Sequence, residues 1–163
     1  MIKKSNPKLN LSPEERKKLR KAKIKISEIL DLAPDELEVI LKVNSERVKT
    51  LVSLAEFQTV PSVGIKFAED LIFMGYYSLA ELKEKDGAKL LDEFERKKGF
   101  WTDPCVEDQF RLIVDFAKNP SITKNWWDYT EERKIYRAES GYPKDRPKTV
   151  WYEANPIKWK TKK

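Results

Sequence analysis

Residues 57–71 read Phe-Gln-Thr-Val-Pro-Ser-Val-Gly-Ile-Lys-Phe-Ala-Glu-Asp-Leu. A helical pattern ends near Phe57, and a tight turn containing Pro61 follows it. Pro61 presets φ for a turn, and we expect Gly64 to take the positive φ that the turn needs before the next helix. The apolar residues of that next helix recur at helical spacing and are Ile65, Ala68, Leu71 and Ile72. The stretch therefore predicts two helices joined by a short turn.

The start of the second helix is a candidate anion site. Its first amides have no acceptor inside the helix, and the positive end of the helix dipole lies there, close to Lys66. The stretch resembles the helix-hairpin-helix element, whose hairpin amides grip a backbone phosphate of a nucleic acid. Ser62 stands where that element usually has glycine, and its hydroxyl is a further donor. The expected nucleic-acid-binding residues are Ser62, Val63, Gly64, Ile65 and Lys66. The alternative is a turn that serves only packing or a protein contact.

Composition excludes several classes of enzyme. The chain has 163 residues, one cysteine and no histidine. These absences remove Cys/His zinc sites, Ser-His-Asp and Cys-His nucleophile systems, and histidine general bases. No apolar stretch approaches the ~18 residues of a membrane span, and the chain opens without a signal-peptide pattern. We expect a soluble, cytoplasmic, non-enzymatic protein with no catalytic residue, no metal site and no cofactor.

Basic residues concentrate at the two ends. Residues 1–25 hold ten Lys/Arg and two Asp/Glu, or +8, and residues 144–163 hold seven and two, or +5. Residues 26–143 hold sixteen and twenty-three, or −7. Phosphate neutralisation supplies most non-specific affinity for nucleic acid, so we expect the ends to provide it and the middle alone to bind weakly. The expected organisation is a basic N-terminal arm (1–25), a helical domain (26–120) and an aromatic, Pro-punctuated C-terminal segment packed on the body (121–163).

Helix signals dominate the chain, and no strand pattern is present, so the predicted class is all-α. Ser12, Pro13 and Glu15 predict a capped helix start, after residues 1–10 that we expect to be disordered. We expect the basic helix that follows to continue until the break at residues 33–34. The other predicted helix boundaries are caps at Asn44, Ser78, Asp86 and Asp103, and glycine ends at Gly75 and Gly99.

Three further groups of residues have either a functional or a purely structural interpretation. The tryptophans are candidates for base stacking, but burial against the helices explains most of them, with Trp159 among lysines 158, 160, 162 and 163 as the exception. The carboxylates Asp103, Glu107 and Asp108 are candidates for a Mg²⁺ nuclease site, the least favoured alternative. Cys105 is either a helix-start thiolate or, as we expect, a structural cysteine.

Residues from about 35 to 117 resemble the bacterial Cdd1-like "pathogenicity locus" family, a small helix-hairpin-helix group. The segments that carry the resemblance are residues 46–51, 55–58, 60–64, 68–71, 75–79 and 103–108, the last reading Asp-Pro-Cys-Val-Glu-Asp. The resemblance implies a helical fold and a link to nucleic acid, with no established activity. The chain is also similar in part to DNA glycosylases and to competence-regulator C-terminal domains, but the glycosylases' catalytic aspartate has no counterpart here.

The sequence thus favours a non-enzymatic module that binds nucleic acid without sequence specificity. Hairpin amides would hold one phosphate, and the basic ends would supply most of the affinity. The alternative is a protein-interaction adaptor, in which the acidic middle meets a basic partner and the aromatic segment docks on the body or on a second copy.

Overall fold

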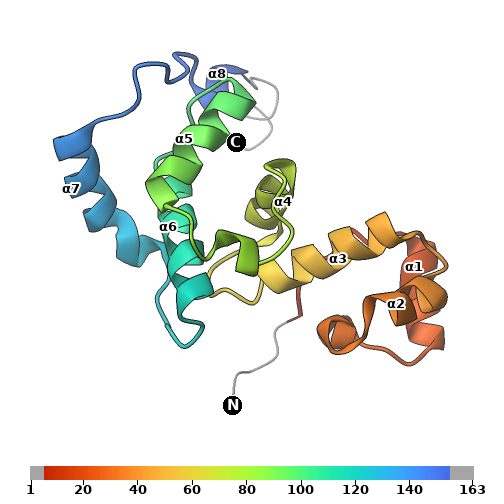
Figure 1. The fold of residues 1–163 in the computed structure, drawn as a ribbon. Coiled ribbons are helices and arrows are strands. Elements are labelled where there is room, and N and C mark those ends of the chain that lie inside the picture. The colour runs from red at the N-terminus through yellow and green to blue at the C-terminus, as the bar shows by residue number, and fades with distance from the viewer. Residues whose placement is uncertain (1–5, 155–163) are drawn as a thin grey trace. The chain divides into compact units, whose positions relative to one another are not determined.

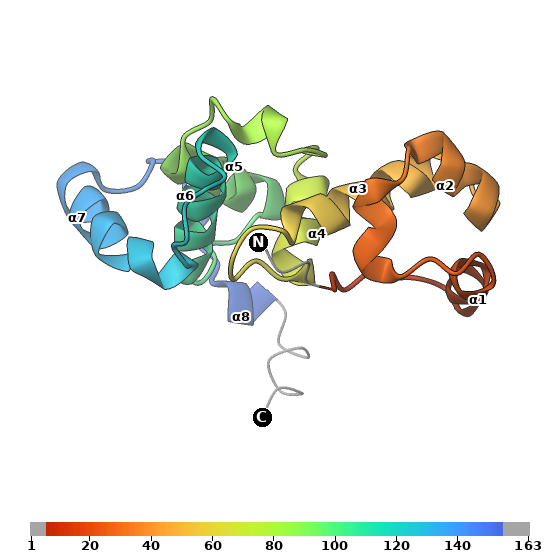
Figure 2. The same ribbon diagram turned by 90° about the horizontal axis from the view of Figure 1, so that it is seen from below.

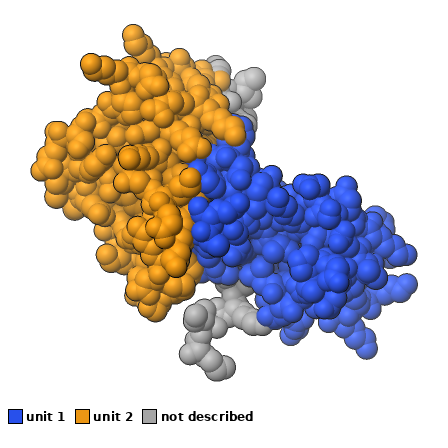
Figure 3. All heavy atoms as spheres, viewed as in Figure 1, with its two compact units in different colours: residues 1–81 blue, residues 82–163 orange. Residues whose placement is uncertain are grey.

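The structure is a computed structural model that describes residues 6–154. In this range the regular secondary structure is helical, apart from one isolated parallel bridge between Trp101 and Val150. The predicted all-α class is confirmed. Contacts divide the chain into two compact units, residues 1–81 and 82–163, which Figure 3 draws in two colours. The three segments expected from composition are not the units of this division.

Unit 1 is arranged along one central helix, α3. Its elements are α1 (Pro13–Lys21), the 3₁₀ turn η1 (Ile26–Asp31), α2 (Pro34–Leu41), α3 (Ser45–Phe57) and α4 (Ile65–Phe73). Figures 1 and 2 show α1 and α2 at one end of α3 and α4 at the other. Leu37, Leu41, Phe57, Ala68 and Leu71 are completely buried and form the core of this unit.

Side-chain caps fix where the helices begin, as the sequence predicts. Ser12 Oγ accepts from the Glu15 amide at 3.1 Å, and the Ser12 amide donates to Glu15 Oε1 at 2.8 Å, which completes a capping box. Asn44 Oδ1 accepts from the Arg47 amide at 2.9 Å at the start of α3. Gly75 ends α4 with φ of 93°. These local predictions are confirmed.

The first helix is shorter than predicted. We expected it to continue to residues 33–34, but α1 ends at Lys21, and Lys23 takes φ of 57°. The Ile24 amide donates to the Leu19 carbonyl at 2.9 Å, and the Lys23 amide donates to the Arg20 carbonyl at 3.0 Å. This is the bonding pattern of a Schellman end. The prediction was wrong because a lysine occupies the left-handed position, so no glycine marks the end of the helix.

The segment before α1 is ordered from residue 6, which corrects the expected disorder for residues 6–10. The Gln58 side chain accepts from the Lys8 amide at 2.9 Å and donates to the Lys8 carbonyl at 2.8 Å. Leu9 and Leu11 are buried. The segment is therefore part of the packing of unit 1, although its sequence has no apolar periodicity.

Unit 2 contains two closely packed helices, α5 (Gly87–Lys98) and α6 (Cys105–Lys118). Asp86 caps α5, as predicted, by accepting from the Lys89 amide at 3.1 Å, and Gly99 ends it with φ of 80°. A Cβ added at Gly87 would lie 2.7 Å from the Arg111 Cα atom, so α5 can approach α6 this closely only with glycine there. The remaining elements are η2 (Ala80–Leu82), which begins at the end of unit 1, η3 (Trp126–Tyr129), α7 (Thr130–Ser140) and α8 (Trp151–Ala154).

Arginine side chains fasten the C-terminal part of the chain to α5 and α6. Arg133 Nε donates to Asp108 Oδ1 at 2.7 Å, and Arg137 Nε donates to Glu107 Oε1 at the same distance. Arg146 Nε donates to Glu95 Oε1, also at 2.7 Å. All three carboxylates are completely buried. The segment is thus held by ion pairs that satisfy buried charges.

Aromatic residues contribute less to this attachment than the sequence suggested. Tyr129 is buried, and its hydroxyl donates to Asp115 Oδ2 at 2.9 Å. Trp127, however, is 54% exposed, and Trp101, Trp126 and Trp151 are half-buried. The expected burial is therefore wrong for Trp127. Across the part of the chain that the structure describes, every helix is too short or too polar to cross a membrane.

Candidate nucleic-acid interface

The connection between α3 and α4, residues 58–64, contains a β-turn. The Val63 amide donates to the Val60 carbonyl at 3.2 Å, with Pro61 and Ser62 between them. Ser62 takes φ of 61°, whereas Gly64 has φ of −101° and ψ of −177°. The predicted positive φ at Gly64 is wrong. Ser62 occupies the second central position of the turn, where the left-handed conformation is required.

Buried apolar residues hold this turn in place. Phe57 ends α3 completely buried, and Val60 and Val63 are 1% and 7% exposed. The Gln58 side chain joins the same region to the extended segment at Lys8. The turn is therefore anchored on both sides.

Helix α4 begins without a side-chain cap. Gly64 is its N-cap, and the Gly64 carbonyl accepts from the Ala68 amide at 3.1 Å. The amides of Ile65 and Lys66 have no acceptor within the helix. Within the described range, every other α-helix of eight or more residues has an acidic residue in its first turn or a side-chain cap, and α4 has neither. The dipole of α4 is therefore not balanced by a local negative charge.

The five predicted binding residues have different environments. Ser62, Gly64 and Lys66 are exposed, and Ile65 is half-buried. Val63 is buried, and its amide is committed to the turn. The Ser62 hydroxyl donates to the Pro61 carbonyl at 2.6 Å. The structure thus gathers Gly64, Ile65 and Lys66 at the open helix start and directs the Val63 amide into the turn.

Gly64 has no packing reason to be glycine. A Cβ built there meets no atom within 4 Å, and its backbone is extended, which any residue can adopt. Neither the fold nor the backbone conformation explains this glycine. A ligand that approaches the backbone closely would explain it.

The basic helix α1 exposes most of its cations. Arg16, Lys17, Arg20 and Lys21 are exposed, whereas the Lys18 ammonium donates to the Leu41 carbonyl at 3.0 Å. Glu15 is buried and accepts from Arg47 Nε at 2.9 Å. The Arg47 guanidinium holds the pKa of Glu15 at about 2, well below its ordinary value. The acid on α1 that faces the core is thus neutralised from α3.

The candidate nuclease carboxylates do not form an accessible cluster. Glu107 and Asp108 are buried against arginines, and Asp103 is exposed and accepts from the Cys105 amide at 2.8 Å. In the described range, no group of three or more acidic or cysteine side chains is arranged to hold a metal. Burial and the hydrogen bond to Asp103 raise the pKa of the Cys105 thiol to about 11, against thiolate character. Trp159 and the lysines around it lie outside the described residues.

Sequence reasoning missed the arginines that neutralise the buried carboxylates. Arg133 and Arg137 are one helical turn apart on α7 and carry the two main pairs. The available signal was their i, i+4 spacing, matched to the adjacent acids Glu107 and Asp108. Such a match indicates an ion-pair ladder between two helices, not a metal site.

The structure is that of an all-helical protein in which a turn anchored by buried residues leads into a helix, α4, that has no side-chain cap. The chain belongs to the Cdd1 family, described as "Pathogenicity locus", whose sequence model matches residues 50–135. It is similar to mitomycin resistance protein McrB of Streptomyces lavendulae, with 30% identity over 88 residues, which are 54% of this chain and 83% of that protein. No solved structure matches the chain.

Proposed function

We propose that this protein is a non-enzymatic module that binds nucleic acid, most simply DNA, through the sugar-phosphate backbone. The α3–α4 connection serves as the hairpin of a helix-hairpin-helix element. One phosphate lies against the amides of Gly64, Ile65 and Lys66, with the Lys66 ammonium beside it. The observation that carries the proposal is the open start of α4, with neither cap nor acid, preceded by a glycine that the fold does not require.

Exposed cations of α1 add affinity without sequence specificity. Because these side chains reach solvent, they can approach phosphates and release counterions. The basic C-terminal end, residues 155–163, lies outside the described residues, and its contribution rests on its sequence alone.

The test is fluorescence anisotropy with labelled duplex and single-stranded DNA at low salt. Lys66→Glu should weaken binding by about tenfold, since it replaces a charge-assisted contact with repulsion. Gly64→Ala should also weaken binding, although it leaves the fold intact. The matched control is Lys89→Glu, because Lys89 is an exposed lysine in the first turn of a helix that Asp86 already caps. Affinity in the millimolar range, or equal effects of Lys66→Glu and Lys89→Glu, contradicts the proposal.

A protein-interaction adaptor is the second candidate, and exposed apolar side chains favour it. Trp127, Ile135 and Tyr136 of unit 2 are 54%, 59% and 37% exposed. If the adaptor role is correct, Gly64→Ala and Lys66→Glu have no effect on DNA binding. Light scattering then shows whether Ile135→Asp changes self-association.

A non-enzymatic role also predicts that supercoiled plasmid stays uncut in the presence of the protein and Mg²⁺.

A further inference from the structure

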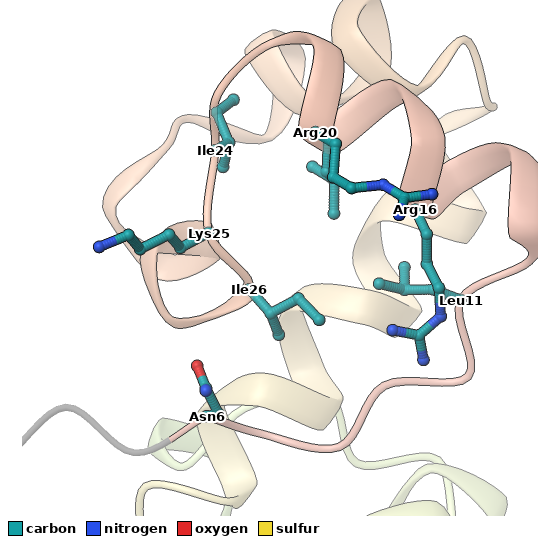
Figure 4. Close-up of a pocket in the computed structure, with 8 residues that line it drawn as sticks. Asn6, Leu11, Arg16, Arg20, Ile24, Lys25 and Ile26 are labelled. Atoms are coloured by element: carbon teal, nitrogen blue, oxygen red, sulfur yellow. The ribbon is translucent and has the colours of Figure 1, made fainter.

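Unit 1 contains a pocket beside α1 whose aliphatic lining has no role in the proposed function. It has a volume of about 380 Å³ and lies between α1, the loop after it, and the extended segment that includes Asn6. Figure 4 shows the Arg16 and Arg20 side chains extending from α1, with Leu11 beside Arg16 and with Ile26 farther away. Leu19 and Ile24 complete an aliphatic lining, and Lys25 is the third cation beside it.

The cations of this pocket have no acidic partner among the described residues. Among residues 6–154, neither Arg16, Arg20 nor the Lys25 side chain has an acidic side chain within ion-pair distance. Of the described residues that line the pocket, none is acidic. Arg16 and Arg20 are one helical turn apart, a spacing at which like charges destabilise a helix. A bound anion shared by both guanidiniums removes that repulsion.

The arginine and the lysine side chains of α1 line two different hollows. Both arginines among the first 25 residues line this pocket. A second hollow, on the other side of the helix, is lined instead by Lys17, Lys18 and Lys21, together with Glu14. Guanidinium groups bind carboxylate and phosphate through paired hydrogen bonds, whereas ammonium groups act as point charges. The arginine side is therefore the one suited to holding one oriented anionic head.

We propose that this pocket binds a small amphipathic anion, with a carboxylate or phosphate-monoester head on Arg16 and Arg20 and an aliphatic body against Leu11, Leu19 and Ile26. The volume lies within the range of small-molecule sites. None of the described residues that line the pocket is aromatic, so they offer no stacking platform for a nucleobase. The site precedes residue 50, where the family match begins, and does not depend on the proposed binding of nucleic acid.

The test is a calorimetric and NMR titration of the full chain with hexanoate and hexyl phosphate. At least one of the two should bind about tenfold or more tightly than acetate or inorganic phosphate, because the head alone leaves the aliphatic lining unused. It should also bind more tightly than hexan-1-ol, which lacks the charge. The amides of Leu19, Ile24 and Ile26 should shift during the titration.

Two double variants separate this site from general attraction of anions. Arg16→Gln with Arg20→Gln should weaken binding by at least about tenfold, as expected for loss of charge-assisted hydrogen bonds. Lys17→Gln with Lys21→Gln removes the same charge from the other side of α1 and should leave the affinity unchanged. All four residues are exposed, and melting curves establish that both proteins are folded. Equal losses in both variants, no loss in either, absent shifts at the three amides, or tighter binding of adenosine monophosphate overturns the proposal.

Discussion

In the α3–α4 connection, the left-handed backbone conformation falls on Ser62 and not on Gly64. Ser62 takes the left-handed φ, and its hydroxyl bonds to the Pro61 carbonyl. Gly64 adopts an extended backbone beside open space. At the scale of single residues, the position that needs glycine for the backbone carries serine, and the glycine stands where the backbone does not need it.

This division predicts opposite responses to substitution. Ser62→Gly should stabilise unit 1 by up to about 1 kcal/mol, because it relieves left-handed strain at a non-glycine residue. Gly64→Ala should change the free energy of unfolding by less than about 0.5 kcal/mol, since the poorer N-cap and the stiffer unfolded chain offset each other. Urea unfolding measures both. A large loss of stability for Gly64→Ala would mean that the fold itself requires this glycine.

Glu15 makes the stability of unit 1 sensitive to acid. Its pKa is about 2 in the folded protein, against an ordinary 4.5, because Arg47 binds the charged form. The stabilisation is therefore complete above about pH 4.5 and is lost as the pH falls toward 2. Glu15→Gln should cost about 1.5–3 kcal/mol at pH 6. The cost should shrink steadily between pH 4.5 and pH 2.

Thermal melts of the wild type and the variant from pH 2 to pH 6 test this expectation. The exposed neighbour Glu14, changed to Gln, is the matched control and should show a small difference at every pH. A difference between the wild type and Glu15→Gln that does not vary with pH rules out the ion pair with Arg47 as its source.

At the scale of elements, α7 is attached through charge more than through apolar packing. Arg133 is itself buried against Asp108, and Thr130 Oγ1 also donates to Asp108 Oδ2 at 2.9 Å. Arg137 contacts Glu107 and also donates to Asp92 Oδ1 at 3.0 Å. Arg111 Nη2 lies 2.9 Å from Glu107 Oε2 but without hydrogen-bond geometry, so we assign the Arg111 bond to Nε, also at 2.9 Å.

Removing one partner of a buried ion pair should therefore lower the free energy of unfolding substantially. Arg133→Ala leaves Asp108 buried without its main partner and should destabilise unit 2 by about 3–5 kcal/mol. Lys134→Ala is the control on the same helix, because Lys134 is 61% exposed and its ion pair is with Glu131, which is 83% exposed. It should cost less than about 0.5 kcal/mol. Denaturant unfolding followed by tryptophan fluorescence distinguishes the two, and similar costs would contradict the ion-pair account.

At the scale of the whole molecule, formal charge is a poor guide to the exposed surface. The −7 of residues 26–143 includes Glu95, Glu107 and Asp108, which are completely buried and paired with arginines. By unit, residues 1–81 hold 14 basic and 12 acidic residues, or +2, and residues 82–163 hold 19 and 15, or +4. Deleting residues 1–25 would also remove buried Leu9 and Leu19, so substitution is the cleaner test of the basic arm.

If the protein binds DNA as proposed, the salt dependence of the affinity reports how many phosphates the full chain neutralises. Changing the exposed lysines Lys17, Lys21, Lys23 and Lys25 to Gln should reduce the slope of log affinity against log salt by up to about 0.9 per lost duplex contact. Lys66→Glu should remove about one contact. Anisotropy titrations across a series of salt concentrations measure the slopes. A quadruple variant with the wild-type slope excludes these four lysines from the interface.

Local signals in the sequence were sufficient for much of the fold. The caps at Ser12, Asn44 and Asp86 and the glycine ends at Gly75 and Gly99 involve residues a few positions apart, so the sequence alone determined the helical class and most helix starts. The candidate anion site was located in the same way, because a turn and a helix start are local features.

Only the tertiary structure decided the features that depend on residues far apart in the sequence. Lys23 and Ser62 take left-handed backbones at positions where the sequence has no glycine to mark them. Glu15 meets Arg47 across 32 positions of the chain, and Asp108 meets Arg133 across 25. Side chains that far apart are paired only when the helices pack, and burial then decides which carboxylates are neutralised and which cations stay exposed.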